Sequence, residues 1–468
     1  MSGVSEDILS RFAAIAGEAQ AIRDPHSKEA YLHEWRGLWH GQTPMVLRPS
    51  NTEQVSRIMA LATETRTVMV PQSGNTGLVG GQIPDRSNTQ IVLSLDRMTR
   101  VIEANAPNNS LTVEAGVTLK AAQDAADAID RLFPLSLASE GSCRIGGNLS
   151  TNAGGLNTLA FGNARELCLG LEVVLADGRV WNGLKSLRKD NTGYDLRNIF
   201  IGAEGTLGII TAAVLKLFPK PKSHSTCFAG ITSPAAAVEL LSLAREASGN
   251  RLVAFELIPR LAIDFTVKHM CVRDPLAEPY PYYVLSELAD ADRASIDSLW
   301  NQAFERKLVQ DAAVAQSESQ RQAFWQIREL LSESQKFEGG SIKNDVSVPV
   351  AQVPALYEQA TAAVLKVMPG VRFMAFGHMG DGNIHFNLSQ PVGMDKQAFL
   401  DRWQDLSGAV SDVVLKLGGS ISAEHGIGVL KRNDMLRIKS PAELQMMRGL
   451  KQLFDPLNIL NPGKVLPE

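Results

Sequence analysis

The sequence predicts an α+β fold with more than one domain. The chain has 468 residues, too many for a single hydrophobic core. Residues 44–220 are rich in glycine and β-branched residues, which is typical of short strands between turns. After the segment Phe218 to Lys222, which holds two prolines and two lysines, predicted strands are grouped with amphipathic helices. This change in the pattern of predicted elements indicates a domain boundary near residue 220.

The first half of the chain opens with a helix. Residues 1–17 hold Glu6 and Asp7 and lack a cationic start, which favours an amphipathic helix over a signal peptide. A capping box from Ser50 to Glu53 predicts a helix to about Glu64. Short runs of β-forming residues predict strands at 45–47, 67–70, 111–114, 171–175, 200–201 and 207–214.

In the second half of the chain, predicted strands alternate with predicted helices. Strands are predicted at 226–231, 252–257 and 282–287, and helices at 234–247, from 292 onward and at 323–336. Two further strands, VRFMAF and IHFNLS, enclose two histidines. Ser440 and Glu443, with Pro441 at the first helical position, predict a capped last helix that ends at Asp455.

Composition excludes several classes of function. The net charge is −4 and no basic block is present, so no nucleic-acid partner is expected. The four cysteines form no CxxC pair, which favours buried free thiols in a reducing cytosol. No stretch approaches 18 apolar residues, so no transmembrane span is expected. We expect a cytoplasmic chain, with peripheral contact with the inner membrane left open.

Three glycine clusters lie in the first half, at residues 74–81, 145–155 and 202–211. Glycines permit close backbone approach, so successive N–H groups can form a nest for an anion such as a pyrophosphate. One cluster alone is as well explained by tight turns, but three in one domain are not. No strand is followed by GxGxxG and no GxxxxGK[ST] occurs, which argues against a Rossmann site and excludes a P-loop.

Two motifs near the C-terminus carry metal-binding residue types. GHMGDGNIHFN holds His378 and His385, and AEHGIG holds Glu424. Asp381-Gly382 predicts a type I′ hairpin turn, which would place the two histidines opposite each other on paired strands. Two histidines and one glutamate with an open fourth position are typical of a catalytic zinc site. A surface hairpin with two solvated histidines is an equally good reading of the hairpin alone.

Together these motifs resemble a known family. PQSGNTGLVGG, IGGNLSTNAGG, TGYDLRNIFIGAEGTLGIIT, GHMGDGNIH, AEHGIG and DPLNILNPGK occur in this order over almost the whole chain. They are similar to the FAD-linked D-2-hydroxy-acid dehydrogenases of the vanillyl-alcohol-oxidase-type fold, and most similar to the D-2-hydroxyglutarate dehydrogenases. The resemblance implies an FAD-binding domain at 1–220, an inserted α+β cap domain for the substrate at 221–419, and a C-terminal segment, 420–468, that completes the FAD domain and active site.

The resemblance also implies a noncovalent FAD site. No histidine lies near the glycine clusters to tether a flavin, and the nearest, His40, matches no such motif. Ser73 departs from the glycine common in the family, which we expect to be harmless if its φ is negative. The implied FAD-binding residues are Pro71, Ser73, Gly74, Asn75, Thr76, Gly77, Leu78, Gly80, Gly141, Ser142, Gly147, Asn148, Thr151, Asn152, Glu204, Gly205, Ile209, Ile210 and Asn461.

A substrate and metal site is implied on the cap side. His378, His385 and Glu424 match the metal ligands, with zinc favoured and manganese possible by ligand type. His425 matches the catalytic base, which also contacts substrate. The substrate-binding residues implied are Arg328, Ser332, Lys343 and Asn387; Arg328 and Ser332 share a helix face at i and i+4.

The implied reaction oxidises D-2-hydroxyglutarate to 2-oxoglutarate, with hydride transfer to flavin N5 and the hydroxyl proton taken by His425. A D-lactate or glycolate dehydrogenase is the nearest alternative. A zinc hydrolase leaves the glycine clusters unexplained, and a non-catalytic flavin-binding subunit of a larger complex is a third class. The family implies an electron-transfer flavoprotein or a quinone as electron acceptor, and a homodimer is the default assembly.

Overall fold

The computed structural model describes residues 3–467, and the chain divides into two compact units. The first unit comprises residues up to 154, then 162–220, and the chain from 424 onward. The second unit comprises Gly155–Phe161 and Pro221–Ala423. Each unit contains its own sheets. The first unit is built from segments at both ends of the sequence.

The first unit contains a small, mostly parallel sheet. Its strand order is β1-β2-β4-β3, where β1 is Ala21–Ile22, β2 Val46–Leu47, β3 Met69–Gln72 and β4 Ile91–Ser94. Helices α1 (Glu6–Ala16) and α3 (Thr52–Thr65) pack on each other and supply Phe12 and Met59 to the core. The predicted N-terminal helix is thereby confirmed.

A second sheet of the first unit is antiparallel, and the third glycine cluster leads into its strand β10. Its order is β5-β6-β10-β8-β9, with bounds Val101–Asn105, Ser110–Glu114, Ile209–Lys216, Cys168–Val174 and Val180–Gly183 respectively. The short pair β7 (Arg131–Leu132) and β11 (Phe218–Pro219) lies apart from it. The helices of this region are α4 (Leu119–Asp127), α5 (Ile145–Ser150), α7 (Arg197–Phe200) and, after the second unit, α15 (Met435–Ile438) and α16 (Pro441–Phe454).

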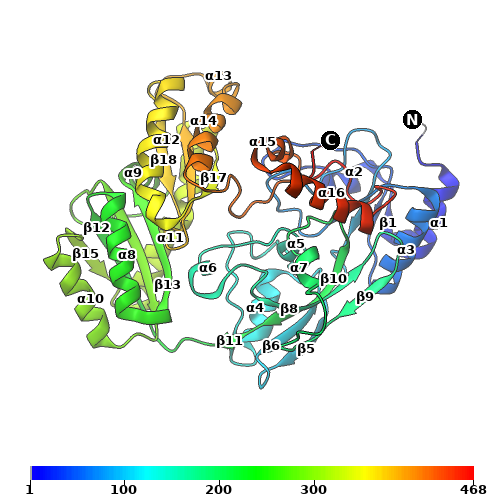
Figure 1. Ribbon diagram of the computed structural model, residues 1–468, viewed down its shortest axis with the longest axis horizontal. Helices are drawn as coiled ribbons and strands as arrows, with labels where there is room; N and C mark the ends of the chain where they lie inside the picture. Colours follow the sequence, from blue (N-terminus) through cyan, green and yellow to red (C-terminus); the bar gives the residue numbers. More distant parts are fainter. Residues whose placement is uncertain (1–2, 468) are drawn as a thin grey trace. The chain divides into compact units, whose positions relative to one another are not determined.

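The second unit begins with a four-stranded antiparallel sheet of order β13-β14-β12-β15. The strands are β12 (His224–Ile231), β13 (Leu252–Pro259), β14 (Tyr282–Ala289) and β15 (Asp311–Val314). Helices α8 (Pro234–Ser248) and α10 (Arg293–Glu305) lie side by side along this sheet (Figure 1). Helices α9 (Arg260–His269) and α11 (Glu318–Ser334) pack apolar residues against Phe228 and Leu285.

The other sheet of the second unit is built around β19 (Asn383–Ser389). β18 (Arg372–Phe376) pairs with one edge of β19, and β16 (Ser341–Ile342) and β17 (Asp345–Ser347) with the other. Helices α12 (Val353–Val367) and α14 (Trp403–Lys416) pack on each other beside it. A backbone bridge joins the two sheets, because Leu257 N donates to Gly377 O at 2.9 Å and Gly377 N to Leu257 O at 3.0 Å.

Most predicted strands and helices are confirmed to within a few residues, including the capping box of Ser440 and Glu443 on α16. Three predictions are wrong in detail. Phe200 ends helix α7 and Ile201 follows it, so no strand forms at 200–201. Asn51 rather than Ser50 caps α3, because its side chain accepts the Gln54 N–H. Cys271 is exposed, whereas the other three free cysteines are buried as expected.

The predicted type I′ turn at Asp381-Gly382 is also wrong. Such a turn needs positive φ at both residues, but only Gly382 has it, at 85°. Phe376, not His378, lies opposite His385 in the β18–β19 register. His378 therefore belongs to the loop between the strands. No helix among residues 3–467 is long and apolar enough to cross a membrane.

Several hydrogen bonds hold the buried carboxylate of Glu287 in the second unit. Its oxygens accept hydrogen bonds from Arg321 at 2.8 Å and from Trp325 at 2.7 Å and Thr226 at 2.8 Å. Burial raises the pKa of Glu287, but these hydrogen bonds and the one with His224 lower it by a larger amount, so the net shift is downward. A depressed folded-state pKa stabilises the fold above the unfolded value and loses that contribution as the pH falls through the folded value.

We therefore expect Glu287→Gln to destabilise β12 and β14 most at neutral pH. The free energy of local opening, measured by hydrogen exchange, should fall by about 3 kcal/mol at pH 7. The reason is that Arg321 would keep its charge beside a neutral amide. The difference from the wild type should shrink below about pH 4, where the unfolded carboxyl is protonated. The exposed Glu246→Gln serves as the matched control, and a pH-independent difference would contradict the assignment.

Candidate functional site

In the first unit, the loops that hold the first two glycine clusters meet at Gly74. A Cβ atom built on Gly74 would lie 2.4 Å from the carbonyl oxygen of Ser142 and 2.9 Å from Cα of Cys143. Gly147 N donates to Ser73 Oγ at 3.2 Å. Ser73 keeps φ outside the positive region, as expected, so serine fits the loop without strain. The two loops thus form one continuous backbone surface.

The third cluster and the C-terminal segment join this surface. The carboxylate of Glu204 accepts the N–H groups of Ile427 at 2.7 Å and Gly428 at 2.8 Å. Asn461 Nδ2 donates to Gly81 O at 3.0 Å and to Glu204 O at 2.9 Å. Burial raises the pKa of the Glu204 carboxyl, which the two backbone donors partly offset.

Lys464 completes the support of the first loop. Its ammonium donates to Gly80 O at 3.2 Å and to Ile83 O at 2.7 Å, and burial lowers its pKa to about 8. Lys464 closes the motif DPLNILNPGK, and no role was predicted for it from the sequence. The signal was present, since a lysine among glycine and proline turns is free to reach backbone carbonyls.

The remaining predicted FAD residues fall on the same few segments. Pro71 lies in β3, and a Cβ on Gly205 would lie 3.2 Å from its Cγ. Asn148 is buried in α5, and Asn152 has a φ of 51° just after it. Ile209 and Ile210 are buried in β10. The other members lie in the loops described above: Asn75, Thr76, Gly77, Leu78, Gly141 and Thr151. Closely packed glycine loops that expose backbone N–H groups fit a dinucleotide pyrophosphate.

In the second unit, the buried carboxylate of Glu256 on β13 organises a polar cluster. Its Oε2 accepts Arg328 Nε at 2.5 Å, and its Oε1 lies 2.6 Å from His378 Nδ1. Glu256 is 0% exposed and Arg328 is 8% exposed. Burial raises the pKa of Glu256, but the charge of Arg328 and the hydrogen bonds from Arg328 and His378 lower it by more, so the carboxyl remains ionised. Sequence reasoning missed Glu256, although a lone carboxylate in the apolar run LVAFELIP signals a paired buried charge.

The two predicted histidine ligands of this unit are neighbours despite the wrong turn. Their ring centroids are 5.5 Å apart with an interplanar angle of 78°. His385 Nδ1 lies 3.9 Å from Oδ1 of Asp345, which is buried on the adjacent strand β17. The hydrogen bond from His378 Nδ1 to Glu256 is the kind that orients a metal-binding histidine through Nε2, and Asp345 places a second carboxylate on the Nδ1 side of His385. The donor set of this unit fits a divalent ion.

Of the predicted substrate residues of the second unit, Arg328 shares the carboxylate of Glu256 with His378, and Asn387 lies on the same strand as His385. Arg328 lies over the ring of Phe376 at 4.9 Å, and Asn387 is buried two residues after His385 on β19. Lys343 donates to Gln335 Oε1, and Gln335 donates to Ser389 Oγ at 2.7 Å. Ser332 is exposed, one helical turn after Arg328 on α11.

Glu424 and His425 belong to the first unit. They begin its C-terminal segment directly after Ala423, the last residue of the second unit. Chain continuity keeps them near the end of the second unit, and Ser420 is bridged to Ser347 at the end of β17. Joint coordination by all three predicted ligands is part of the proposal below.

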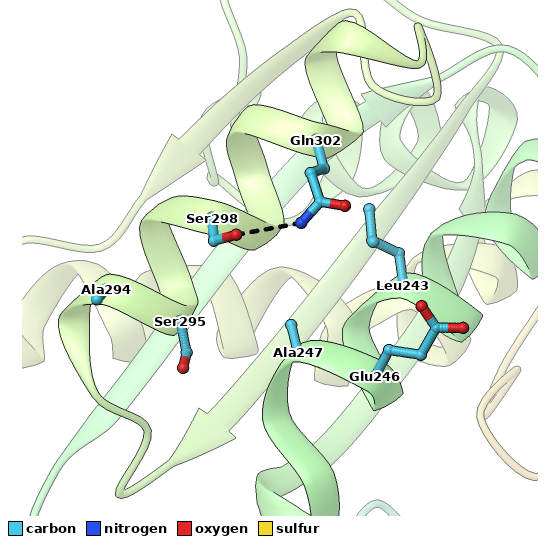
Figure 2. A pocket seen from close by; sticks show the side chains of 7 residues that line it. All are labelled: Leu243, Glu246, Ala247, Ala294, Ser295, Ser298 and Gln302. Carbon is cyan, nitrogen blue, oxygen red and sulfur yellow. Dashed lines mark hydrogen bonds between the residues drawn. The ribbon is translucent and has the colours of Figure 1, made fainter.

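A shallow pocket lies elsewhere in the second unit, between α8 and α10 (Figure 2). It is lined by Leu243, Glu246, Ala247, Ala294, Ser295, Ser298 and Gln302. Gln302 Nε2 donates to Ser298 Oγ at 3.1 Å across one helical turn. These side chains include one carboxylate, that of Glu246, and no histidine, cysteine or cation, so the pocket offers no redox group and no set of metal ligands.

The fold and the joined glycine loops define an FAD-binding oxidoreductase. Residues 43–183 match the FAD binding domain family, and residues 220–465 match the C-terminal domain of FAD linked oxidases. The structure superposes on p-cresol methylhydroxylase with substrate bound at a TM-score of 0.75 and 17% identity, covering 99% of this chain and 98% of that one. This similarity establishes the vanillyl-alcohol-oxidase-type fold.

Curated relatives of higher sequence identity indicate the branch of this family to which the chain belongs. It is 37% identical to the mitochondrial D-2-hydroxyglutarate dehydrogenase of Danio rerio, over 100% of this chain and 86% of the relative. It is 34% identical to the D-2-hydroxyglutarate dehydrogenase of Xanthomonas citri pv. viticola, over 94% and 93% respectively. The chain belongs to the FAD-linked oxidase family, in its D-2-hydroxy-acid dehydrogenase branch.

Gly74→Ala should impair flavin binding, because its methyl group would overlap backbone atoms of Ser142 and Cys143. Overpacking of this kind costs about 1–3 kcal/mol, which corresponds to a loss of flavin affinity of roughly 5- to 150-fold. Flavin absorbance per chain after dilution measures the effect. Gly408→Ala is the control, since a Cβ there meets nothing within 4 Å. Equal flavin retention by both variants would remove Gly74 from the site.

Proposed function

We propose that this chain is a metal- and FAD-dependent dehydrogenase that oxidises D-2-hydroxyglutarate to 2-oxoglutarate. The observation that carries the proposal is Glu256, which is ion-paired to Arg328 and hydrogen-bonded to His378. One buried carboxylate thus orients both an anion-binding cation and a metal-ligand histidine. The named relatives support the substrate.

In this proposal FAD occupies the joined glycine loops, and His378, His385 and Glu424 hold a zinc or manganese ion. When bound, the flavin supplies the redox chemistry and the ion supplies Lewis acidity that makes the substrate hydroxyl a stronger acid. The flavin is noncovalent, because the chain offers no histidine in a tethering motif at the loops.

The chain's own groups bind the substrate and move one proton. Arg328 and Lys343 pair with carboxylate groups of the substrate, and Asn387 donates a hydrogen bond to it. His425 accepts the hydroxyl proton as general base. Ser332, one helical turn beyond Arg328, binds the distal carboxylate.

The number of donors favours a dicarboxylate. A monocarboxylate such as D-lactate has no second carboxylate to offer to the set Arg328, Lys343, Ser332 and Asn387. It therefore forgoes the charge-assisted hydrogen bonds that a distal carboxylate would accept, which disfavours it as a substrate. An electron-transfer flavoprotein or a quinone accepts the electrons. The chain forms a homodimer in the cytoplasm. This location stays a prediction, because the relative from Danio rerio is named as mitochondrial.

Anaerobic titration with D-2-hydroxy acids tests the substrate. D-2-hydroxyglutarate should bleach the flavin absorbance, and its kcat/KM should exceed that of D-lactate by at least about tenfold, or roughly 1.4 kcal/mol. D-malate should fall between them. Ser332→Ala should lower kcat/KM for D-2-hydroxyglutarate and leave D-lactate nearly unchanged. A preference for D-lactate would replace the dicarboxylate assignment, and a flavin that no hydroxy acid bleaches would indicate a non-catalytic subunit.

Chelation tests the metal. A chelator should abolish substrate-driven bleaching while leaving the flavin spectrum intact, and zinc or manganese should restore it. Glu256→Gln should weaken metal affinity by about 10- to 100-fold, because the outer hydrogen bond to a ligand histidine is weakened. The exposed Glu246→Gln should bind metal like the wild type.

His425→Ala separates proton transfer from metal binding. It should retain metal and FAD but reduce the flavin about 10²- to 10⁴-fold more slowly in stopped flow, the usual loss for a general base. Full activity after complete metal removal would contradict the metal mechanism, and an unchanged reduction rate in His425→Ala would reassign the base.

A further inference from the structure

A second group of histidines lies in the first unit, on a short hairpin before β2. Residues 32–41 fold back on themselves, with Gly41 N donating to Leu32 O at 2.9 Å and Glu34 N to Trp39 O at 3.1 Å. His33 and His40 form the antiparallel bridge of this hairpin. Their rings are stacked, with centroids 4.3 Å apart and an interplanar angle of 11°.

Glu29 adds a carboxylate to this histidine pair. It begins a 3₁₀ helix (Glu29–Tyr31) four residues before His33. Its Oε1 is hydrogen-bonded to His33 Nε2 and lies 3.6 Å from His40 Nε2. The ligand atoms of all three residues lie within 4.8 Å of one another.

This spacing is close to that of a zinc site. Zinc–ligand bonds of about 2.0–2.1 Å put two tetrahedral ligands about 3.3 Å apart, so small side-chain rotations suffice. The side chains are about half exposed, at 52% for Glu29, 46% for His33 and 47% for His40, which leaves room for water as a fourth ligand. Two imidazoles and one carboxylate favour zinc, nickel or copper over magnesium or calcium.

We propose that Glu29, His33 and His40 form a second site for a divalent transition metal, separate from the proposed active-site ion. The hairpin is already ordered for this role. The buried carboxylate of Glu34 accepts Arg36 Nε at 3.0 Å and Leu38 N at 3.2 Å, which fixes the turn. An ion therefore binds without having to order the chain, and the ordering cost is small.

The hairpin also supports the first glycine-rich loop. Asn75 Nδ2 donates to Ala30 O and to His33 O, both at 3.0 Å. Arg36 donates to Leu78 O, and a Cβ on Gly80 would lie 2.8 Å from the ring of Trp39. An ion held by Glu29, His33 and His40 would therefore brace the loop that contains Asn75. The effect of this ion on flavin binding rests on the proposed role of the Asn75 loop in FAD binding.

Zinc binding to a variant without the proposed active-site ligands tests the inference. His378→Ala/His385→Ala should still bind about one zinc ion per chain after chelator treatment, and cobalt should give the visible absorption of a tetrahedral site. Adding His40→Ala should weaken zinc binding by about 100-fold or more, since a ligand is lost. Adding His26→Ala, an exposed histidine of the same segment outside the ligand set, should leave binding unchanged.

Two readouts keep the result independent of catalysis. Zinc at about 100 times its Kd should raise the Tm of His378→Ala/His385→Ala but not that of the His40→Ala derivative. Zinc should also slow flavin release from His378→Ala/His385→Ala and leave flavin release from the His40→Ala derivative unchanged. No zinc bound by His378→Ala/His385→Ala, or equal binding after adding His40→Ala, would overturn the site. Equal flavin release with and without zinc would overturn the bracing of the loop. Failure of the proposed oxidation affects neither measurement, because no substrate is used.

Discussion

The arrangement of the second unit depends on one buried carboxylate. Glu256 is fully buried on β13 and is compensated by Arg328 and His378, which come from α11 and from the loop after β18. A buried charge without partners would cost several kcal/mol, so the three segments are tied to one another. The bridge between Leu257 and Gly377 fixes the backbone one residue away. Positioning of the predicted metal ligand and of the predicted anion-binding arginine therefore has a common origin.

Close backbone approach shapes the glycine loops of the first unit, and the charged groups of Glu204 and Lys464 add hydrogen bonds to their backbone surroundings. Gly74 packs against Ser142 and Cys143 at distances that exclude even a methyl group. The C-terminal segment then closes this arrangement, because Asn461 donates to carbonyl groups of two different glycine clusters. Residues separated by almost 400 positions are thus part of one surface, which explains why the FAD-binding unit needs both ends of the sequence.

The sequence predicted those features that local geometry determines. Glycine loops, helix caps such as Ser440 and the strands beside His385 depend on a few neighbouring residues. Contacts between distant segments were not predictable in this way. His378 was expected opposite His385, but Gly377 pairs with Leu257 and β18 ends at Phe376. Phe200 has strand propensity, yet it ends a helix because its ring packs against Trp181 and Phe454. Glu256 was missed because its partners are fixed only by the tertiary structure.

The two histidine pairs of this chain differ in what surrounds them. His378 Nδ1 is hydrogen-bonded to the buried carboxylate of Glu256, which fixes its orientation before any ion arrives, and the buried Asp345 lies 3.9 Å from His385 Nδ1. His33 and His40 are half exposed and stacked on each other, and their one carboxylate is itself a ligand candidate. Fixed, dehydrated ligands bind an ion tightly and suit chemistry that must recur at each turnover. Exposed ligands exchange their ion with solvent, so occupancy of the hairpin site follows the free metal concentration, whereas the ion proposed for the active site is resident.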